Sequence, residues 1–266
     1  MKKIGFIGAG NMAEAIIKGI VSKNLFSKQD IFISDVDKNR LNFINNEYGA
    51  IKAKDNLCLV NSVDIIVIAV KPQNAEEVLE GLRSANKEGK LFISIMAGKK
   101  ISWIKSFLGN KISVIRVMPN TPALLGYGMS SLVKDNCVCC DESFKIIKEI
   151  FKAIGEIIEV DEDKIDIVTA LSGSGPAYLF LLAEAMIESG TVNGLSEKQA
   201  SLLTAQTILG AGQMLKMSSD SAKKLREKVT SKGGTTEAAL DVFNKENWTE
   251  IVFRAILAAK KRSIQL

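Results

Sequence analysis

Histidine is absent from this chain of 266 residues. Its absence removes the commonest general acid or base and the commonest metal ligand, and it excludes any nucleophile that a histidine activates. Chemistry at this protein must therefore depend on a cofactor, on hydroxyl, lysine or carboxylate groups, and on backbone dipoles.

Cysteine, clustered charge and long apolar runs are also scarce. The four cysteines, at positions 58, 137, 139 and 140, do not match the ligand spacing of a structural zinc framework, so we expect reduced thiols, a cytoplasmic protein and no bound metal. The net charge of +5 comes from interleaved residues without a long basic run, which argues against nucleic-acid binding. The apolar run 177–183 stops at Glu184, so no membrane span is expected.

What the chain does carry is a short apolar strand that runs directly into a glycine turn, KKIGFIGAGNMA at residues 2–13. Gly8 permits a tight turn, Gly10 removes a side chain that would hold a phosphate away, and Ala13 lets helix and strand pack closely. The helix start adds free N–H groups and a positive dipole end. We interpret this turn as a seat for a dinucleotide pyrophosphate; the alternative is a strand-to-helix turn that binds nothing.

The first part of the chain alternates strand and helix patterns. After the first strand, we expect strands at 30–34, 50–53, 62–70, 91–95 and 112–117, and then at 130–133 and 156–160 near one edge. Helical patterns occupy 37–47, 74–84, 100–108 and 142–153. This rhythm predicts a Rossmann-type, doubly wound parallel α/β sheet.

From residue 163 onward strand patterns give way to helical ones, at 165–171, 176–189, 197–215, 221–228, 237–243 and 249–262. We therefore expect a Rossmann domain over 1–162 and an all-α domain over 163–266. Ser196, with Gln199 three residues later, predicts a capping box. The long apolar helices exceed what one small helical domain can bury, which favours a second copy of the chain as their cover.

The scarce prolines mark the expected working surface. AVKPQ (69–73), SIMAG (94–98) and RVMPNTP (116–122) each end a predicted strand. Open α/β sheets bind ligands at the carboxyl ends of their strands, although any one of these turns can be only a rigid connection. In the helical half, LSGSGPAY (171–178) predicts a small-residue turn that opens a helix. VTSKGGTT (229–236) predicts a glycine turn at a helix start, suited to a carboxylate or serving only as a cap.

Together these segments resemble the pyrroline-5-carboxylate reductase family over essentially the whole chain. The resemblance implies reduction of 1-pyrroline-5-carboxylate to L-proline with NADPH or NADH, the last step of proline biosynthesis. It also implies a helical dimerisation domain and a homodimer that assembles further, for example into a decamer. A cyclic imine needs a proton at nitrogen as hydride reaches carbon, and a hydroxyl or a water can relay it.

The resemblance implies roles for individual residues. The substrate carboxylate would lie on the N–H groups of Gly233, Gly234, Thr235 and Thr236, the Thr236 hydroxyl would meet the ring nitrogen as the catalytic group, and Glu162 would line the same pocket. Cofactor contacts are expected at Ile7, Gly8, Ala9, Gly10, Asn11, Met12, Asn56, Ala69, Val70, Lys71, Pro72, Met96, Ala97 and Gly98.

Asp35 ends the second predicted strand, where a carboxylate holds the ribose 2′-OH of NAD and repels a 2′-phosphate. Lys38 and Arg40 follow and could instead accept that phosphate, so the sequence leaves the cofactor preference open. Two departures from the family pattern stand out. Lys232 replaces a proline before the glycine pair, and residues 219–222 (SDSA) replace a histidine–proline element. Both predict weaker substrate binding.

Rival interpretations remain at this stage. An imine reductase or a β-hydroxyacid dehydrogenase shares the Rossmann-plus-helical layout, but the lysine or aspartate that such enzymes carry on a long interdomain helix has no equivalent here. A non-catalytic dinucleotide-sensing dimer would not need the carboxylate-suited VTSKGGTT segment.

Overall fold

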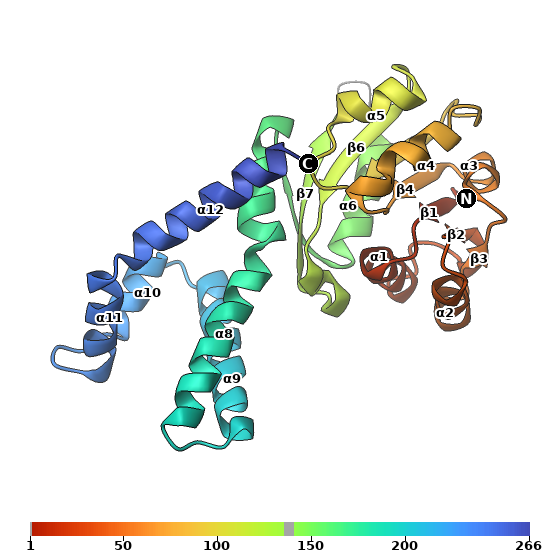
Figure 1. The fold of residues 1–266 in the computed structure, drawn as a ribbon. Helices are drawn as coiled ribbons and strands as arrows, with labels where there is room; N and C mark the ends of the chain where they lie inside the picture. Colours follow the sequence, from red (N-terminus) through yellow and green to blue (C-terminus); the bar gives the residue numbers. More distant parts are fainter. Residues whose placement is uncertain (1, 136–140) are drawn as a thin grey trace. The chain divides into compact units, whose positions relative to one another are not determined.

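The computed structural model describes residues 2–135 and 141–266 (Figure 1). Its strands are β1 (Ile4–Ile7), β2 (Ile31–Ser34), β3 (Ile51–Lys52), β4 (Ile65–Ile68), β5 (Leu91–Ser94), β6 (Ser113–Met118), β7 (Gly128–Lys134) and β8 (Gly155–Glu159). The longer helices are α1 (Asn11–Ser22), α2 (Lys38–Tyr48), α3 (Asn56–Ser62), α4 (Ala75–Gly81), α5 (Ile101–Leu108), α6 (Asp141–Lys152), α8 (Gly175–Val192), α9 (Glu197–Met217), α10 (Ala222–Lys228), α11 (Thr235–Lys245) and α12 (Trp248–Ile264). Short helical segments are η1 (Lys28–Asp30), η2 (Pro72–Asn74), η3 (Thr121–Leu125), η4 (Glu162–Lys164), α7 (Ile165–Val168) and η5 (Thr169–Gly173).

The strands form one sheet in the order β3-β2-β1-β4-β5-β6-β7-β8. The strands from β3 to β6 are parallel, which confirms the Rossmann-type sheet. The strand order switches at β1, because the chain places β2 and β3 on one side of β1 and then β4, β5 and β6 on the other. β1 and β4 therefore lie at the centre of the parallel strands, with Ile4 opposite both Ile31 and Ile65. Ligands bind this class of sheet at the carboxyl ends of its central strands.

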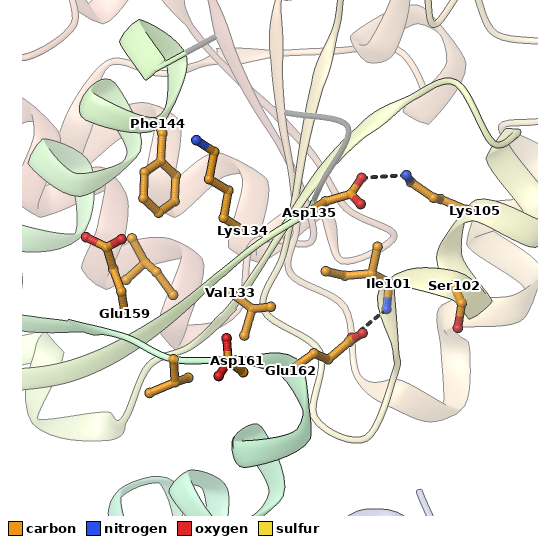
Figure 2. A pocket seen from close by; sticks show the side chains of 12 residues that line it. Ile101, Ser102, Lys105, Val133, Lys134, Asp135, Phe144, Glu159, Asp161 and Glu162 are labelled. Carbon is orange, nitrogen blue, oxygen red and sulfur yellow. Dashed lines mark hydrogen bonds and ion pairs between the residues drawn. The ribbon is translucent and has the colours of Figure 1, made fainter. Parts of the chain in front are cut away.

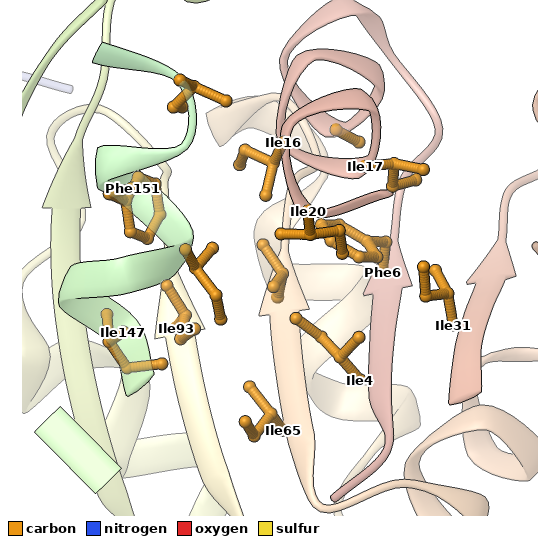
Figure 3. Close-up of a cluster of buried hydrophobic side chains, with 14 of the residues drawn as sticks. Ile4, Phe6, Ile16, Ile17, Ile20, Ile31, Ile65, Ile93, Ile147 and Phe151 are labelled. Atoms are coloured by element: carbon orange, nitrogen blue, oxygen red, sulfur yellow. The ribbon is translucent and has the colours of Figure 1, made fainter. Parts of the chain in front are cut away.

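Alternate residues of the central strands enter two hydrophobic cores, one on each face of the sheet. Ile4 and Phe6 of β1 pack in the core that contains Ile16 and Ile20 of α1 and Phe151 of α6 (Figure 3). On the opposite face, the core comprises Ile7, Ile66 and Ile68 from the strands with Leu59, Leu79 and Ile104 from α3, α4 and α5. Burial on both faces explains why these strands read as continuous apolar runs.

The last two strands depart from the expected parallel sheet, because β7 pairs antiparallel with β6. Only residues 119–127 connect the two strands, and a parallel crossover needs a dozen or more residues. β8 then pairs parallel with β7, after α6 has crossed back over the sheet. The edge of the sheet therefore runs opposite to its centre.

Two local structures differ from the sequence-based expectations. α3 had no predicted counterpart, because its seven residues are too few to show helical periodicity; Asp55 caps it by accepting the N–H of Cys58 at 2.7 Å. The segment around Ser172 is not a turn that opens a helix. It is a π-helical stretch, η5, in which the N–H of Ser174 donates to the carbonyl of Thr169 at 2.9 Å. A π-helical insertion of this kind often marks a functional site.

The contacts of the chain divide it into two compact units, Met1–Ser174 with Ala259–Leu266, and Gly175–Ala258. The last turn of α12 belongs with the first unit, where Ser263 donates to the carboxylate of Asp166 at 2.7 Å. The domain boundary expected at residue 162 stays a prediction. Three of the cysteines, at positions 137, 139 and 140, lie outside the described residues, and Cys58 is exposed.

The second unit is helical and leaves much of its apolar surface uncovered. Ser196 and Gln199 form the predicted capping box at the start of α9. Phe180 and Leu202 are more than half exposed. A groove of about 1020 Å³ runs between the helices and is lined mainly by apolar side chains, among them Leu182, Met186, Leu203, Phe243, Trp248 and Val252.

The apolar run in this region is longer than the sequence suggested. η4, α7, η5 and α8 form one helical stretch, Glu162–Val192, that is long and apolar enough to cross a membrane by length and composition alone. A helix that packs against a second chain has the same composition, so this likeness is weak evidence for a span.

Candidate functional site

The glycine turn after β1 joins the ends of three strands. The N–H of Gly8 donates to the carbonyl of Ser34 at the end of β2, and the N–H of Ala69 after β4 donates to the carbonyl of Ile7. Gly8 has φ +99°, and an added Cβ there would lie 2.6 Å from the carbonyl oxygen of Ala69. Both the backbone angle and the close approach therefore require glycine at this position.

Gly10 serves the opposite purpose, because it faces open space. It is the N-cap residue of α1 with φ −71°, and an added Cβ would meet no atom within 4 Å among the described residues. No side chain among residues 2–135 and 141–266 caps α1, so the N–H groups of its first turn are available to an anion. Below the turn, Ala13 is buried and lets α1 lie close to the sheet. These features fit a dinucleotide pyrophosphate.

Asp35 follows β2 and is held beside the glycine turn by two backbone donors. Its Oδ2 accepts the N–H of Ala9 at 2.6 Å, and its Oδ1 accepts the N–H of Asp37 at 2.8 Å. Asp37 in turn caps α2 by accepting the N–H groups of Asn39 and Arg40. The carboxylate of Asp35 therefore has a fixed position at the strand end where a dinucleotide ribose binds in this fold.

Arg40 is engaged with neighbours rather than free for a phosphate. Its Nε donates to the carbonyl of Ala9 at 2.9 Å, and its guanidinium lies 2.7 Å from the carboxylate of Glu14. Tyr48 donates its hydroxyl to the same carboxylate at 3.2 Å. Burial, and then the charge of Glu14, raises the pKa of the Tyr48 hydroxyl, so this group stays protonated and remains a donor. Sequence reasoning missed Glu14 and Tyr48, because nothing in their spacing shows that they meet Arg40.

The remaining predicted cofactor residues follow strands at the same edge of the sheet. Asn56, the first residue of α3, accepts a hydrogen bond from the Ser34 hydroxyl at 2.7 Å. Ala69–Pro72 follow β4, and Met96–Gly98 follow β5, the neighbouring strand. Gly98 has φ +73° and lies against Leu266 of the last turn. The structure thus brings the ends of β1, β2, β4 and β5 together along one rim, while contact with a cofactor remains a proposal for each residue.

Asn120 lies at the end of β6, and sequence reasoning had not singled it out individually. Its Nδ2 donates to the carbonyl of Ser172 at 3.1 Å, and its Oδ1 accepts the N–H of Met129 at 2.8 Å. This side chain therefore ties the RVMPNTP turn to the π-helical stretch and to the start of β7. The RVMPNTP motif indicated that the segment around Asn120 matters, but only the tertiary structure shows that Asn120 bonds to Ser172 and Met129.

Glu162 belongs to the first unit and has structural partners there. Its Oε1 accepts the N–H of Ile101 at 2.8 Å, at the start of α5 (Figure 2). The same oxygen lies 3.2 Å from the guanidinium of the buried Arg116. It also lines a cavity of about 630 Å³ between α5, β7 and the start of η4. These contacts account for a glutamate at this position, and its expected role at the substrate stays a prediction.

The VTSKGGTT segment lies in the second unit and forms a tight turn before α11. The N–H of Gly234 donates to the carbonyl of Ser231 at 3.0 Å, and Gly233 has φ +72°. The N–H of Gly233 donates to the carboxylate of Glu237 at 2.6 Å. Within the described residues, the N–H groups of Thr235 and Thr236 have no acceptor, as expected for the first turn of a helix. The turn already holds one carboxylate, that of Glu237, which sequence reasoning did not anticipate.

Comparison with known proteins decides the family. A family model described as "Pyrroline-5-carboxylate reductase dimerisation" matches residues 162–266, and one described as "NADP oxidoreductase coenzyme F420-dependent" matches residues 3–98. The pyrroline-5-carboxylate reductase of Pseudomonas aeruginosa is 40% identical over 268 residues, covering 99% of this chain and 96% of that protein. The chain belongs to the pyrroline-5-carboxylate reductase family.

Solved structures agree with this assignment. A pyrroline-5-carboxylate reductase from Coxiella burnetii superposes with a TM-score of 0.89 at 36% identity, covering 99% of this chain and 98% of that one. The pyrroline carboxylate reductase of Plasmodium falciparum, solved with NADP bound, gives a TM-score of 0.90 at 33% identity, covering 99% and 97%. The predicted fold, a Rossmann-type sheet followed by a helical dimerisation domain, is confirmed.

Membership of the pyrroline-5-carboxylate reductase family also decides between the alternative functions that the sequence left open. It confirms the resemblance over the full chain and removes the ground for a β-hydroxyacid dehydrogenase or a separate imine reductase. The motifs that distinguished the family from other dehydrogenases were those of the helical half, and these lie within the matched residues 162–266.

Proposed function

We propose that this chain reduces 1-pyrroline-5-carboxylate to L-proline by hydride transfer from NADPH or NADH, the last step of proline biosynthesis. The observation that carries the proposal is identity of 35–40% to pyrroline-5-carboxylate reductases over essentially the full length of both chains. The glycine turn supports it independently, because Gly10 opens onto free space at an uncapped helix start.

The cofactor, when bound, supplies the hydride; the protein supplies position and electrostatics. In the proposal, the N–H groups at the start of α1 hold the pyrophosphate and Asp35 faces the adenosine ribose. Ala69–Pro72 and Met96–Gly98, at the ends of β4 and β5, line the rest of the dinucleotide. All of these residues belong to the first unit, and their elements are fixed by the two hydrophobic cores.

The substrate is assigned to the turn before α11. Its carboxylate would bind the N–H groups of Gly233, Gly234, Thr235 and Thr236, and the free N–H groups of the two threonines support this role. The Thr236 hydroxyl would donate to the ring nitrogen, or relay a proton to it from water, as carbon accepts hydride. Such a relay needs no histidine, which agrees with the composition of the chain.

The proposed working form is a cytoplasmic homodimer that assembles further, for example into a decamer. The exposed apolar groove of the second unit and the match to a dimerisation model over residues 162–266 support a dimer. A second copy laid on this groove would remove from water the side chains that the single chain leaves exposed. Sedimentation of the purified protein would measure the size of the assembly.

A spectrophotometric assay tests the function directly. Purified protein is mixed with 1-pyrroline-5-carboxylate and NADPH or NADH, and oxidation of the nicotinamide is followed together with formation of proline. A 2-hydroxy or 3-hydroxy acid with the oxidised cofactor serves as the comparison substrate. Protein that binds NADPH and never oxidises it with the cyclic imine would instead be the dinucleotide-sensing dimer.

A further inference from the structure

The rim beside Asp35 carries more fixed negative charge than positive charge. Asp35, Asp37 and Glu14 contribute three carboxylates, whereas Lys38 and Arg40 contribute two cations. Arg40 is already paired with Glu14 at 2.7 Å and bound to the carbonyl of Ala9. The charge of Arg40, which the sequence suggested as a partner for a 2′-phosphate, is therefore largely neutralised within the protein.

Asp35 itself is anchored in a way that keeps its charge at the rim. Each of its carboxylate oxygens accepts one backbone N–H, from Ala9 at 2.6 Å and from Asp37 at 2.8 Å, and these two bonds fix the position of the carboxylate. Each oxygen retains a lone pair for a further donor. A ribose 2′-hydroxyl can supply that donor, whereas a 2′-phosphate has none to offer and adds repulsion between like charges.

We propose that Asp35 makes this chain prefer NADH to NADPH, with Glu14 reinforcing the preference by occupying Arg40. This inference rests on the proposed function only in taking the glycine turn as the dinucleotide site. NADPH remains a usable cofactor, because Lys38, the first residue of α2, is exposed and can approach a phosphate. The inference concerns the ratio of the two affinities.

Equilibrium binding tests the preference without any substrate. Dissociation constants of NADH and NADPH are measured by nicotinamide fluorescence at low ionic strength for the purified protein and its variants. We expect the unmodified protein to bind NADH about 10–30-fold more tightly, since an unscreened unit charge about 4 Å from a doubly charged phosphate opposes binding by up to that factor. A ratio near one, or in favour of NADPH, would overturn the inference.

Two variants separate the contributions of the rim. Asp35→Asn keeps one acceptor for a backbone N–H and removes the charge, and it should tighten NADPH binding until the ratio approaches one. Glu14→Gln should tighten NADPH binding by severalfold, because Arg40 loses its ionised partner. An Asp35→Asn protein that keeps the original ratio would assign the preference elsewhere and contradict the proposal.

The matched control is Glu47→Gln, which removes one negative charge at the far, exposed end of α2. It should leave the ratio of the two dissociation constants unchanged. If Asp35→Asn fails to fold, the ratio for the unmodified protein still tests the preference, and Glu14→Gln tests whether this rim sets it. A clear NADH preference in a protein that leaves the cyclic imine unreduced would refute the proposed function and preserve this inference, whereas turnover with equal affinities would do the reverse.

Discussion

The chain contains two glycine turns that open a helix, and they are held in different ways. The first, at Gly8 and Gly10, is clamped by neighbouring strand ends, and an added Cβ at Gly8 would meet the backbone of Ala69. The second, at Gly233 and Gly234, is held by its own segment, through Ser231 and Glu237. An added Cβ at Gly233 would meet nothing within 4 Å among the described residues.

This difference separates two ways of building an anion site. Tertiary packing fixes the first turn, so its geometry is as stable as the sheet beneath it. Local hydrogen bonds fix the second turn, so its geometry can change when a ligand or another chain arrives. We therefore expect substitution of the packed glycine of the first turn, Gly8, to affect folding as well as cofactor binding, and substitutions in the second turn to affect kinetics alone.

The largest effect is expected from Gly8→Ala. Alanine at φ +99° is strained, and its Cβ would lie 2.6 Å from a carbonyl oxygen of the packed strand end. The free energy of unfolding should fall by about 2–5 kcal/mol, and dinucleotide binding should be lost. Thermal or urea unfolding together with fluorescence titration of NADH measures both quantities.

Gly10→Ala is the matched comparison within the same turn. Its φ of −71° suits alanine, and its added Cβ is free of contacts. Stability should stay within about 1 kcal/mol of the unmodified protein, whereas NADH affinity should fall because the methyl group enters the space proposed for the pyrophosphate. Equal loss of stability in both variants would contradict the assignment of a packing role to Gly8 and a binding role to Gly10.

In the second turn, Thr236→Ala should give the next largest effect. The turnover number should fall roughly 10²-fold if the hydroxyl donates to, or relays a proton to, the ring nitrogen. Thr236→Ser retains a hydroxyl and should recover much of the rate. Neither variant should alter the unfolding midpoint appreciably, since no side chain in the described part of the chain caps α11. Undiminished turnover in the alanine variant would remove this hydroxyl from the chemistry.

The contrast between the turns also explains what the sequence could predict. The sequence was sufficient to predict the features whose requirements are local. These are the backbone angle at Gly8, the missing side chain at Gly10, and the burial of the apolar strands on two faces. The Arg40–Glu14 pair joins residues 26 positions apart and leaves no periodic signal. The antiparallel β7 follows from the length of its connection, which was available from the sequence but was outweighed by the rhythm of the preceding strands.

In the second turn, too, the sequence predicted the local features but not the side-chain contacts. The glycine pair and threonines pointed to a carboxylate site, and the free N–H groups of Thr235 and Thr236 agree with it. From the sequence alone, Glu237 could be predicted only to stabilise the first turn of a helix through its negative charge. Its hydrogen bond back to Gly233 depends on a side-chain direction that spacing does not specify. Whether it supports or competes with a substrate is a question for kinetics.

Glu237→Ala addresses that question, with a smaller expected effect. Removing this carboxylate frees the N–H of Gly233 and removes a negative charge near the proposed substrate carboxylate. Two unit charges about 4 Å apart in water repel by about 1 kcal/mol, so KM for the cyclic imine should fall about fivefold with kcat unchanged. A rise in KM would show that Glu237 preorganises the turn rather than occupying it; Asp241→Ala, on the same helix one turn further along, is the control for charge alone.

The smallest effect is expected at Lys232, where the family usually has proline. Residues 231–234 form a turn closed by the bond from the N–H of Gly234 to the carbonyl of Ser231, with φ +72° at Gly233. A positive φ at the third residue is the signature of a type II turn, which favours proline at the second residue. Lys232→Pro should therefore preorganise the turn by about 0.4–1 kcal/mol and lower KM by up to about fivefold. Unchanged kinetics would mean that Ser231 and Glu237 already fix the turn as firmly as a proline ring would. The second turn would then be nearly as rigid as the first, although only local hydrogen bonds hold it.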